Sequence, residues 1–118
     1  MPRLDITAVQ AVTTAGLNPT FDNANASGGQ QFANNGRRIL RVTNTSASAV
    51  TVTVNIPATL DGVAPANGGK QITIPATTGD TLIGPFPATT YNQADGKVYV
   101  DFSAAASVKL AVLEVQPA

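Results

Sequence analysis

Apolar and polar residues alternate along most of the chain, and the alternation is clearest over residues 49–56. Successive side chains of a β-strand point to opposite faces of its sheet, so this period predicts a half-buried strand. Pro57 follows directly and is expected to end the strand, because proline cannot donate a ladder hydrogen bond. The inward positions of this strand are Val50, Val52, Val54 and Ile56.

Residues 37–44 show the same period, with Leu40 and Val42 on the inward face. The polar stretch 44–48 separates this strand from residues 49–56 and is typical of a short turn. We therefore predict a β-hairpin from these two strands.

Four further strands follow toward the C-terminus. Gly84 and Pro85 interrupt the second of them. The expected inward residues are Ile72 and Ile74 in the first of these strands, and Val98, Val100 and Phe102 in the third. The four predicted strands span residues 71–74, 81–86, 97–102 and 108–115.

The alternation slips near Val112 and Leu113 in the last strand. This predicts either a β-bulge or a strand covered on both faces. In an unbroken register, Ala111, Leu113 and Val115 lie opposite the face that carries Val108 and Leu110. Burial in a central strand and contact with another subunit both explain apolar residues there.

The first 35 residues are less regular. Residues 5–14 predict a strand with Ile6, Ala8 and Val12 inward, and residues 18–35 predict a loop anchored by Phe21 and Phe32. Long loops in small domains are commonly functional or become ordered on contact. We therefore expect residues 1–35 to form, in part, an extended arm and loop that contacts a partner.

These segments amount to about seven or eight short strands, with turn signals roughly every 8–12 residues and no convincing helical period. The pattern predicts an all-β fold with little or no helix, as an antiparallel β-sandwich or small barrel of the jelly-roll or immunoglobulin-like kind. A chain of 118 residues is expected to form one domain, spanning 1–118.

The amino-acid composition argues against catalysis and metal binding. The chain has no His and no Cys, which removes the commonest general base and the thiolate nucleophiles and metal ligands. Its seven acidic residues are spread over separate turns and strands, so we expect no enzyme activity, no cofactor and no metal site. Net charge is zero and charged residues make up 12%, so neither a nucleic acid nor a membrane is an expected partner.

Arg37, Arg38 and Arg41 are the densest group of charges, and we expect them to pair with acidic groups on the same or a neighbouring subunit. Together with the anchors of the N-terminal loop and the apolar positions of the last strand, they form the predicted partner contacts. These residues are Phe21, Phe32, Arg37, Arg38, Arg41, Leu113 and Val115.

Several stretches of the chain carry a resemblance to a known family. They are Ile83-Gly84-Pro85-Phe86-Pro87, Tyr91-Asn92, Asp95-Gly96-Lys97-Val98-Tyr99-Val100, the strand 108–115, and Arg38 to Asn44 with its Thr/Val-rich successor. They resemble small virion proteins of tailed bacteriophages, which often act as capsid decoration proteins. The resemblance covers roughly residues 36–115. It implies a compact β-rich fold without catalysis that binds the major capsid protein on the capsid exterior, commonly as a homotrimer near threefold positions. It also implies assembly in the host cytoplasm.

Two other functions remain open from the sequence. A carbohydrate-binding or adhesion β-sandwich would need aromatic side chains on a face or loop, and Tyr91, Tyr99 and Phe21 are its candidates. A tail or head–tail joining component of a virion would share the same sequence features.

Overall fold

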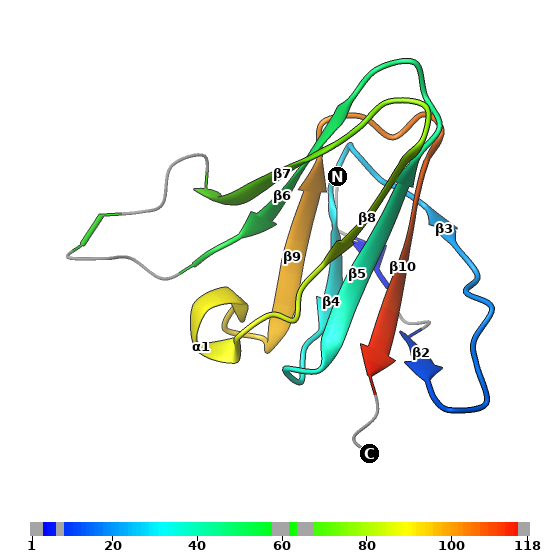
Figure 1. The fold of residues 1–118 in the computed structure, drawn as a ribbon. Helices are drawn as coiled ribbons and strands as arrows, with labels where there is room; N and C mark the ends of the chain where they lie inside the picture. The colour runs from blue at the N-terminus through cyan, green and yellow to red at the C-terminus, as the bar shows by residue number, and fades with distance from the viewer. Residues whose placement is uncertain (1–3, 7–8, 58–61, 64–67, 116–118) are drawn as a thin grey trace.

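Two β-sheets packed face to face form the body of the protein (Figure 1). The structure is a computed structural model that describes residues 4–6, 9–57, 62–63 and 68–115. Its one helix within these ranges is the single turn α1, Ala88–Tyr91. The prediction of an all-β sandwich with little helix is confirmed.

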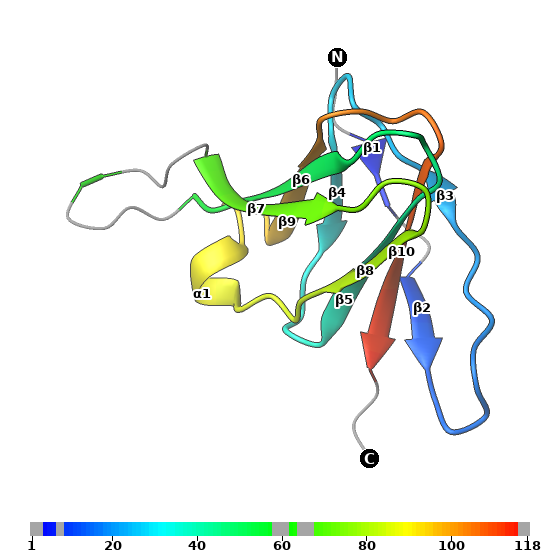
Figure 2. The ribbon, with the colours of Figure 1, turned by 45° about the horizontal axis from the view of Figure 1, so that its top comes forward.

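One sheet, here called sheet A, has five strands. In Figure 2 its strands β6 and β7 run across the view, above the strands of the other sheet. In spatial order the strands of sheet A are β1 (Leu4–Asp5), β4 (Gln30–Ala33), β9 (Lys97–Phe102), β6 (Val50–Asn55) and β7 (Gly69–Ile74).

The second sheet, here called sheet B, is built around the C-terminal strand. That strand pairs with β5 on one side, and two short strands, β2 and β3, share its other side. In spatial order sheet B contains β2 (Val9–Val12), β10 (Val108–Val115), β5 (Arg38–Asn44) and β8 (Gly79–Ile83), with β3 (Asp22–Asn23) beside β10.

The sheets are mixed, whereas the sequence predicted an antiparallel sandwich. The strand β1 pairs with β4 in parallel, and β2 pairs with β10 in parallel, whereas the remaining pairs are antiparallel. Neither N-terminal strand reaches its neighbour through a hairpin turn, so no tight connection fixes an antiparallel direction.

The core lies between the sheets and follows the predicted alternation. Along β6 and β9 every second residue is buried, and the residues between them are half-buried. Ile56, the last inward residue predicted for β6, lies just past the end of that strand and is half-buried. The fully buried side chains include Phe32, Leu40, Val42, Val50, Val52, Val54, Ile74, Val98, Val100, Val108, Leu110 and Val112.

The predicted hairpin between residues 37–44 and 49–56 is wrong. The strands β5 and β6 lie in different sheets, and each buries its apolar residues in the core between the sheets. Two strands with one apolar face each can bury those faces side by side in one sheet or opposite one another in two, so alternation alone does not distinguish the arrangements.

The corner between β5 and β6 is held by Asn44, which is 0% exposed. Its Nδ2 donates to the carbonyls of Ser48 at 2.9 Å and of Pro75 at 3.2 Å, and its Oδ1 accepts from the backbone N–H and the hydroxyl of Ser46. These bonds fix the turn and tie it to the end of β7 in sheet A.

The N-terminal predictions are also corrected. The strand expected over residues 5–14 is two short strands, β1 and β2, which belong to opposite sheets; Ala8 lies outside the described residues. Val12 is on the outer face of sheet B, since its register partner is Val115. The loop expected over residues 18–35 contains β3 and β4, and β4 places Phe32 in the core. The sequence pattern did not predict β4 because this short alternating segment is flanked by polar residues.

The strand β10 is covered on both faces, as one of the two sequence alternatives predicted. Its register with β5 runs unbroken from Val108 opposite Asn44 to Glu114 opposite Arg38, so no bulge interrupts it. Both Ala111 and Leu113, on the outer side, are buried. The apparent slip in alternation therefore reflects a central strand rather than a change of register.

The strand β8 ends at Ile83, before the Gly84–Pro85 peptide bond, which is cis. Phe86 then turns into the core, where its ring centroid lies 5.7 Å from that of Phe32 and 5.5 Å from that of Tyr91. These ring contacts attach α1 to the end of the sandwich.

Candidate interaction surfaces

The outer face of sheet B is rich in apolar side chains. Strand register fixes which residues share it: Arg41 stands between Leu82 of β8 and Ala111 of β10, and Ile39 stands beside Leu113. Leu82 is 62% exposed and Val115 is 48% exposed. We define the sheet B outer face as Gln10, Val12, Ile39, Arg41, Thr43, Asp80, Leu82, Lys109, Ala111, Leu113 and Val115, with Phe21 above it.

An ion pair and an aromatic ring lie in the middle of this face. The Arg41 guanidinium donates from Nε to Asp80 Oδ1 at 2.9 Å and from Nη2 to Oδ2 at 2.7 Å. Its central carbon lies 5.4 Å from the centroid of the Phe21 ring. The hydrogen bonds from Arg41 lower the pKa of Asp80, and the same contact raises the pKa of Arg41.

The register of β3 and β10 places Phe21 next to Ala111. Asp22 pairs with Leu110 across β3 and β10, so the preceding residue, Phe21, falls beside Ala111. The guanidinium carbon of Arg41, the register partner of Ala111 on β5, lies over the Phe21 ring. A larger residue than alanine would compete with the ring for this space.

The seven predicted contact residues differ in how far they are exposed. Phe32 is 1% exposed and Leu113 is 6% exposed, so both serve the packing of the chain itself. Arg37 and Val115 are exposed, while Phe21 and Arg41 are half-buried on the sheet B outer face. Arg38 points inward, where its Nε lies 3.0 Å from Glu114 Oε1.

The pairing expected for the arginines is confirmed for Arg38 and Arg41, whose acidic partners lie on the same chain. Sequence reasoning did not single out Leu82. The sequence feature that indicates its exposure is the pair Leu82-Ile83 inside a short strand. Two adjacent residues of a strand point to opposite faces of the sheet, so one of these two apolar side chains must point outward.

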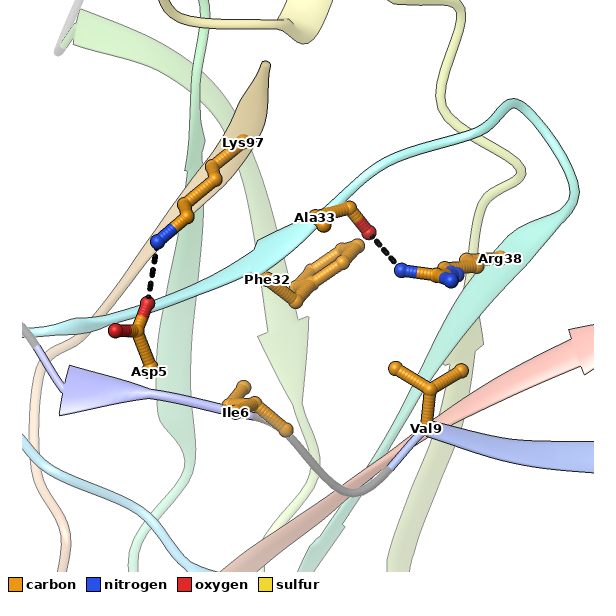
Figure 3. Close-up of a pocket in the computed structure, with 7 residues that line it drawn as sticks. All are labelled: Asp5, Ile6, Val9, Phe32, Ala33, Arg38 and Lys97. Carbon is orange, nitrogen blue, oxygen red and sulfur yellow. Dashed lines mark hydrogen bonds and ion pairs between the residues drawn. The ribbon is translucent and has the colours of Figure 1, made fainter. Parts of the chain in front are cut away.

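A cavity of about 320 Å³ is lined by residues of β1, β2 and β4 together with Arg38 and Lys97 (Figure 3). Ile6, Val9 and Phe32 give it an apolar wall. Its two cations are engaged in contacts: Lys97 Nζ lies 2.8 Å from Asp5 Oδ1, and Arg38 donates to the Ala33 carbonyl. The hydrogen bond from Lys97 lowers the pKa of Asp5.

The outer face of sheet A is polar by contrast. The residues that alternate outward on β6 and β9 are Thr51, Thr53, Asn55, Lys97, Tyr99 and Asp101, as the sequence predicted. Within the described ranges, no group of three or more acidic, His or Cys side chains is placed to hold a metal ion.

No family model, curated protein or solved structure matches this chain. Among the residues described, no helix has the length and apolar character needed to cross a lipid bilayer.

Proposed function

We propose that this protein is a structural virion component that binds the outside of a bacteriophage capsid and stabilises it, with the major capsid protein as its partner. The observation that carries the proposal is the difference between the two outer faces of the sandwich. Sheet B presents the apolar side chains of Leu82 and Val115 together with Phe21 and Arg41, whereas sheet A presents threonine, asparagine and charged side chains and a single aromatic residue on β6 and β9, Tyr99.

Aromatic side chains and arginine are enriched in protein–protein interfaces, and apolar side chains dominate the fully buried centre of an interface. The sheet B outer face has this composition, with the Arg41–Asp80 pair at its middle. The resemblance of residues 36–115 to virion proteins supports the same conclusion and suggests the capsid as the surface that is bound.

The proposed mechanism is thermodynamic. A protein that binds the assembled shell and not its dissociated subunits raises the stability of the shell by its binding free energy. A homotrimer would engage several capsid subunits at once, so avidity would strengthen weak individual contacts. The capsid exterior is then the proposed location, after assembly in the host cytoplasm.

Purified protein added to phage heads that lack it tests the proposal. We expect it to sediment with the heads and to raise their rupture temperature. Leu82→Lys places a charge on the sheet B outer face and is expected to abolish both effects. Thr73→Lys places the same charge on an exposed position of β7 in sheet A and is expected to leave both unchanged.

Failure of the unmodified protein to bind the heads would refute the proposal. If Thr73→Lys abolishes binding and Leu82→Lys preserves it, the sheet B outer face is not the surface that binds the heads. The solution mass of the free protein tests the homotrimer, and imaging of labelled protein on particles separates the head from the tail and the head–tail joint.

A further inference from the structure

The cavity of about 320 Å³ lies at the seam between the two sheets of the sandwich. Asp5, Phe32 and Lys97 line it from sheet A (Figure 3). Val9 of β2 and Arg38 of β5 line it from sheet B. A molecule that fills this space would therefore contact both sheets at once.

One wall of the cavity is apolar and belongs to the hydrophobic core. Phe32 and Ile6 are members of the core cluster, and Val9 packs against it. An apolar cavity of about 150 Å³ holds one benzene molecule, so this cavity has room for a ligand of about a dozen non-hydrogen atoms. Pockets that bind small molecules start at about 300 Å³ and combine mostly apolar walls with a few polar groups. The size and the wall of this cavity fit that description.

The polar groups of the lining keep hydrogen-bond donors that no described residue accepts. Arg38 donates from Nε to Glu114 and from Nη1 to the Ala33 carbonyl, and Lys97 Nζ donates to Asp5 Oδ1. A guanidinium has five N–H donors and an ammonium has three, so both cations have donors left over. A ligand that carries an acceptor oxygen can therefore bond to the lining without breaking a contact within the chain.

Each of the two cations already has a carboxylate partner. Arg38 Nε lies 3.0 Å from Glu114 Oε1, and Lys97 Nζ lies 2.8 Å from Asp5 Oδ1. Moving a charged group from water to a partly apolar cavity costs desolvation free energy, which an unpaired opposite charge would have to offset. Since both cations are paired, the cavity favours an uncharged ligand over a carboxylate or an ammonium.

We infer that this cavity is a binding site for a small uncharged molecule with an aromatic or short aliphatic body and a carbonyl oxygen. The body packs on Ile6, Val9 and Phe32, and the carbonyl accepts a hydrogen bond from the Lys97 ammonium. The Lys97–Asp5 pair is largely exposed, so little free energy opposes a small movement of the ammonium toward the ligand. The lining shares no residue with the sheet B outer face, and the inference does not depend on capsid binding.

Three compounds with one body and different head groups test the inference: para-ethylbenzamide, para-ethylbenzoate and para-ethylbenzylammonium. Each is titrated into isotope-labelled protein, and the backbone amide chemical shifts report both the affinity and the site. We expect saturable binding of the amide with a Kd of about 1 mM or lower, and the largest shifts at Ile6, Val9 and Ala33. The two charged compounds should bind at least about fivefold more weakly. The bound amide should also raise the unfolding temperature, because it binds the folded chain alone.

Two substitutions on β2 test the location. Val9→Phe fills the cavity from its own strand and is expected to weaken binding of the amide at least about tenfold. Val12→Phe adds the same volume on the outer face of β2, beside Val115, and is the matched control. It is expected to bind the amide within about twofold of the parent protein. Circular dichroism checks that each variant is folded.

Lys97→Met tests the assigned hydrogen bond. It removes the donor to the carbonyl and leaves Asp5 without its cation. The amide should then bind about threefold more weakly. The ammonium compound should become the tightest of the three ligands, because the Asp5 carboxylate is now available to pair with it.

The inference is overturned if the amide does not bind saturably or if its chemical-shift changes lie away from the cavity. A preference of the parent protein for either charged compound also overturns it, as does parent-like binding by a folded Val9→Phe variant. If Val9→Phe does not fold, Lys97→Met decides the matter, and an unchanged order of affinities among the three compounds rejects the site.

Discussion

Arg38 and Glu114 are register partners on β5 and β10, and Arg38 Nε lies 3.0 Å from Glu114 Oε1. Both side chains point inward. The next inward residues along the two strands are Leu40 and Val112, which are register partners deeper in the core. Their side chains are 21% and 16% exposed, so the ion pair sits where the space between the sheets reaches solvent.

The opposite end of β5 has a matching arrangement. Arg38 also donates to the Ala33 carbonyl at the end of β4, and Asn44 donates to the Pro75 carbonyl just beyond β7. Each end of β5 thus carries an inward polar side chain that bonds to the backbone of sheet A. Apolar residues lie between them, so these two residues connect the sheets at both ends of the core.

The ion pair is expected to contribute measurably to stability because it is partly shielded from water. A double-mutant cycle with Arg38→Met and Glu114→Gln should give a coupling energy of about 1 kcal/mol in urea unfolding. The same cycle on Lys97 and Asp5, which are more exposed, should give a smaller value. Equal coupling for both pairs would contradict the role assigned to burial.

Asn44→Ala is expected to be the more damaging change. It removes the donor for the Ser48 and Pro75 carbonyls and the acceptor for Ser46 in a fully buried corner. Loss of buried hydrogen-bond partners should lower the free energy of unfolding by about 2–4 kcal/mol, measured by urea denaturation. Asn18→Ala, at an exposed position, is the control and should change it by less than about 0.5 kcal/mol.

The strands were predictable because burial on one face imposes a period of two. The bounds expected for residues 97–102 and 108–115 agree with β9 and β10, and Val98, Val100 and Phe102 are buried as predicted. What the period does not encode is the neighbour of each strand. The corner that leads the chain from β5 into the other sheet is held by a polar residue, Asn44, which bonds to the nearby Ser46 and Ser48 and to the distant Pro75.

The candidate surfaces were less predictable for a related reason. The sequence pointed to Arg41, Phe21 and Val115, but it could not place Leu82 beside Arg41, since this contact comes from pairing of β5 with β8. It named Phe32 as a contact residue because a short strand among polar residues looks like a loop. The N-terminal strands β1 and β2 are defined by their pairing with β4 and β10 more than by an alternating pattern of their own.

Thr77 offers a test of backbone strain. Its φ is 68°, in the left-handed region that a β-branched residue rarely adopts. Its N–H donates to the Ser46 carbonyl at 2.8 Å, which holds the turn between β7 and β8 in this conformation. Thr77→Gly should relieve the strain and raise the free energy of unfolding by about 1 kcal/mol, measured by thermal and urea denaturation.

The adjacent Thr78→Gly variant is the control for Thr77. Its backbone is outside the left-handed region, so glycine there only increases the freedom of the unfolded chain. Thr78→Gly should therefore lower stability. If Thr77→Gly lowers stability as much as Thr78→Gly does, the strain assigned to Thr77 is wrong.

The Arg41–Asp80 pair predicts a pH dependence at acidic pH. Hydrogen bonds from Arg41 hold the pKa of folded Asp80 below its ordinary value of 3.8. A carboxyl group whose pKa is lowered by folding stabilises the fold above its unfolded pKa, and this contribution disappears as pH falls through the folded value. The Asp80 side chain is 42% exposed, so the contribution should be less than about 1 kcal/mol.

We therefore expect the stability difference between the parent protein and Asp80→Asn to be constant from about pH 5 to 7 and to shrink below about pH 4. Urea unfolding at each pH measures it. In an Arg41→Met background the cation is absent, so Asp80→Asn should then cause no pH-dependent difference. A difference that stays constant down to pH values near 2, or one that survives in the Arg41→Met background, would show that Arg41 does not set the ionisation of Asp80.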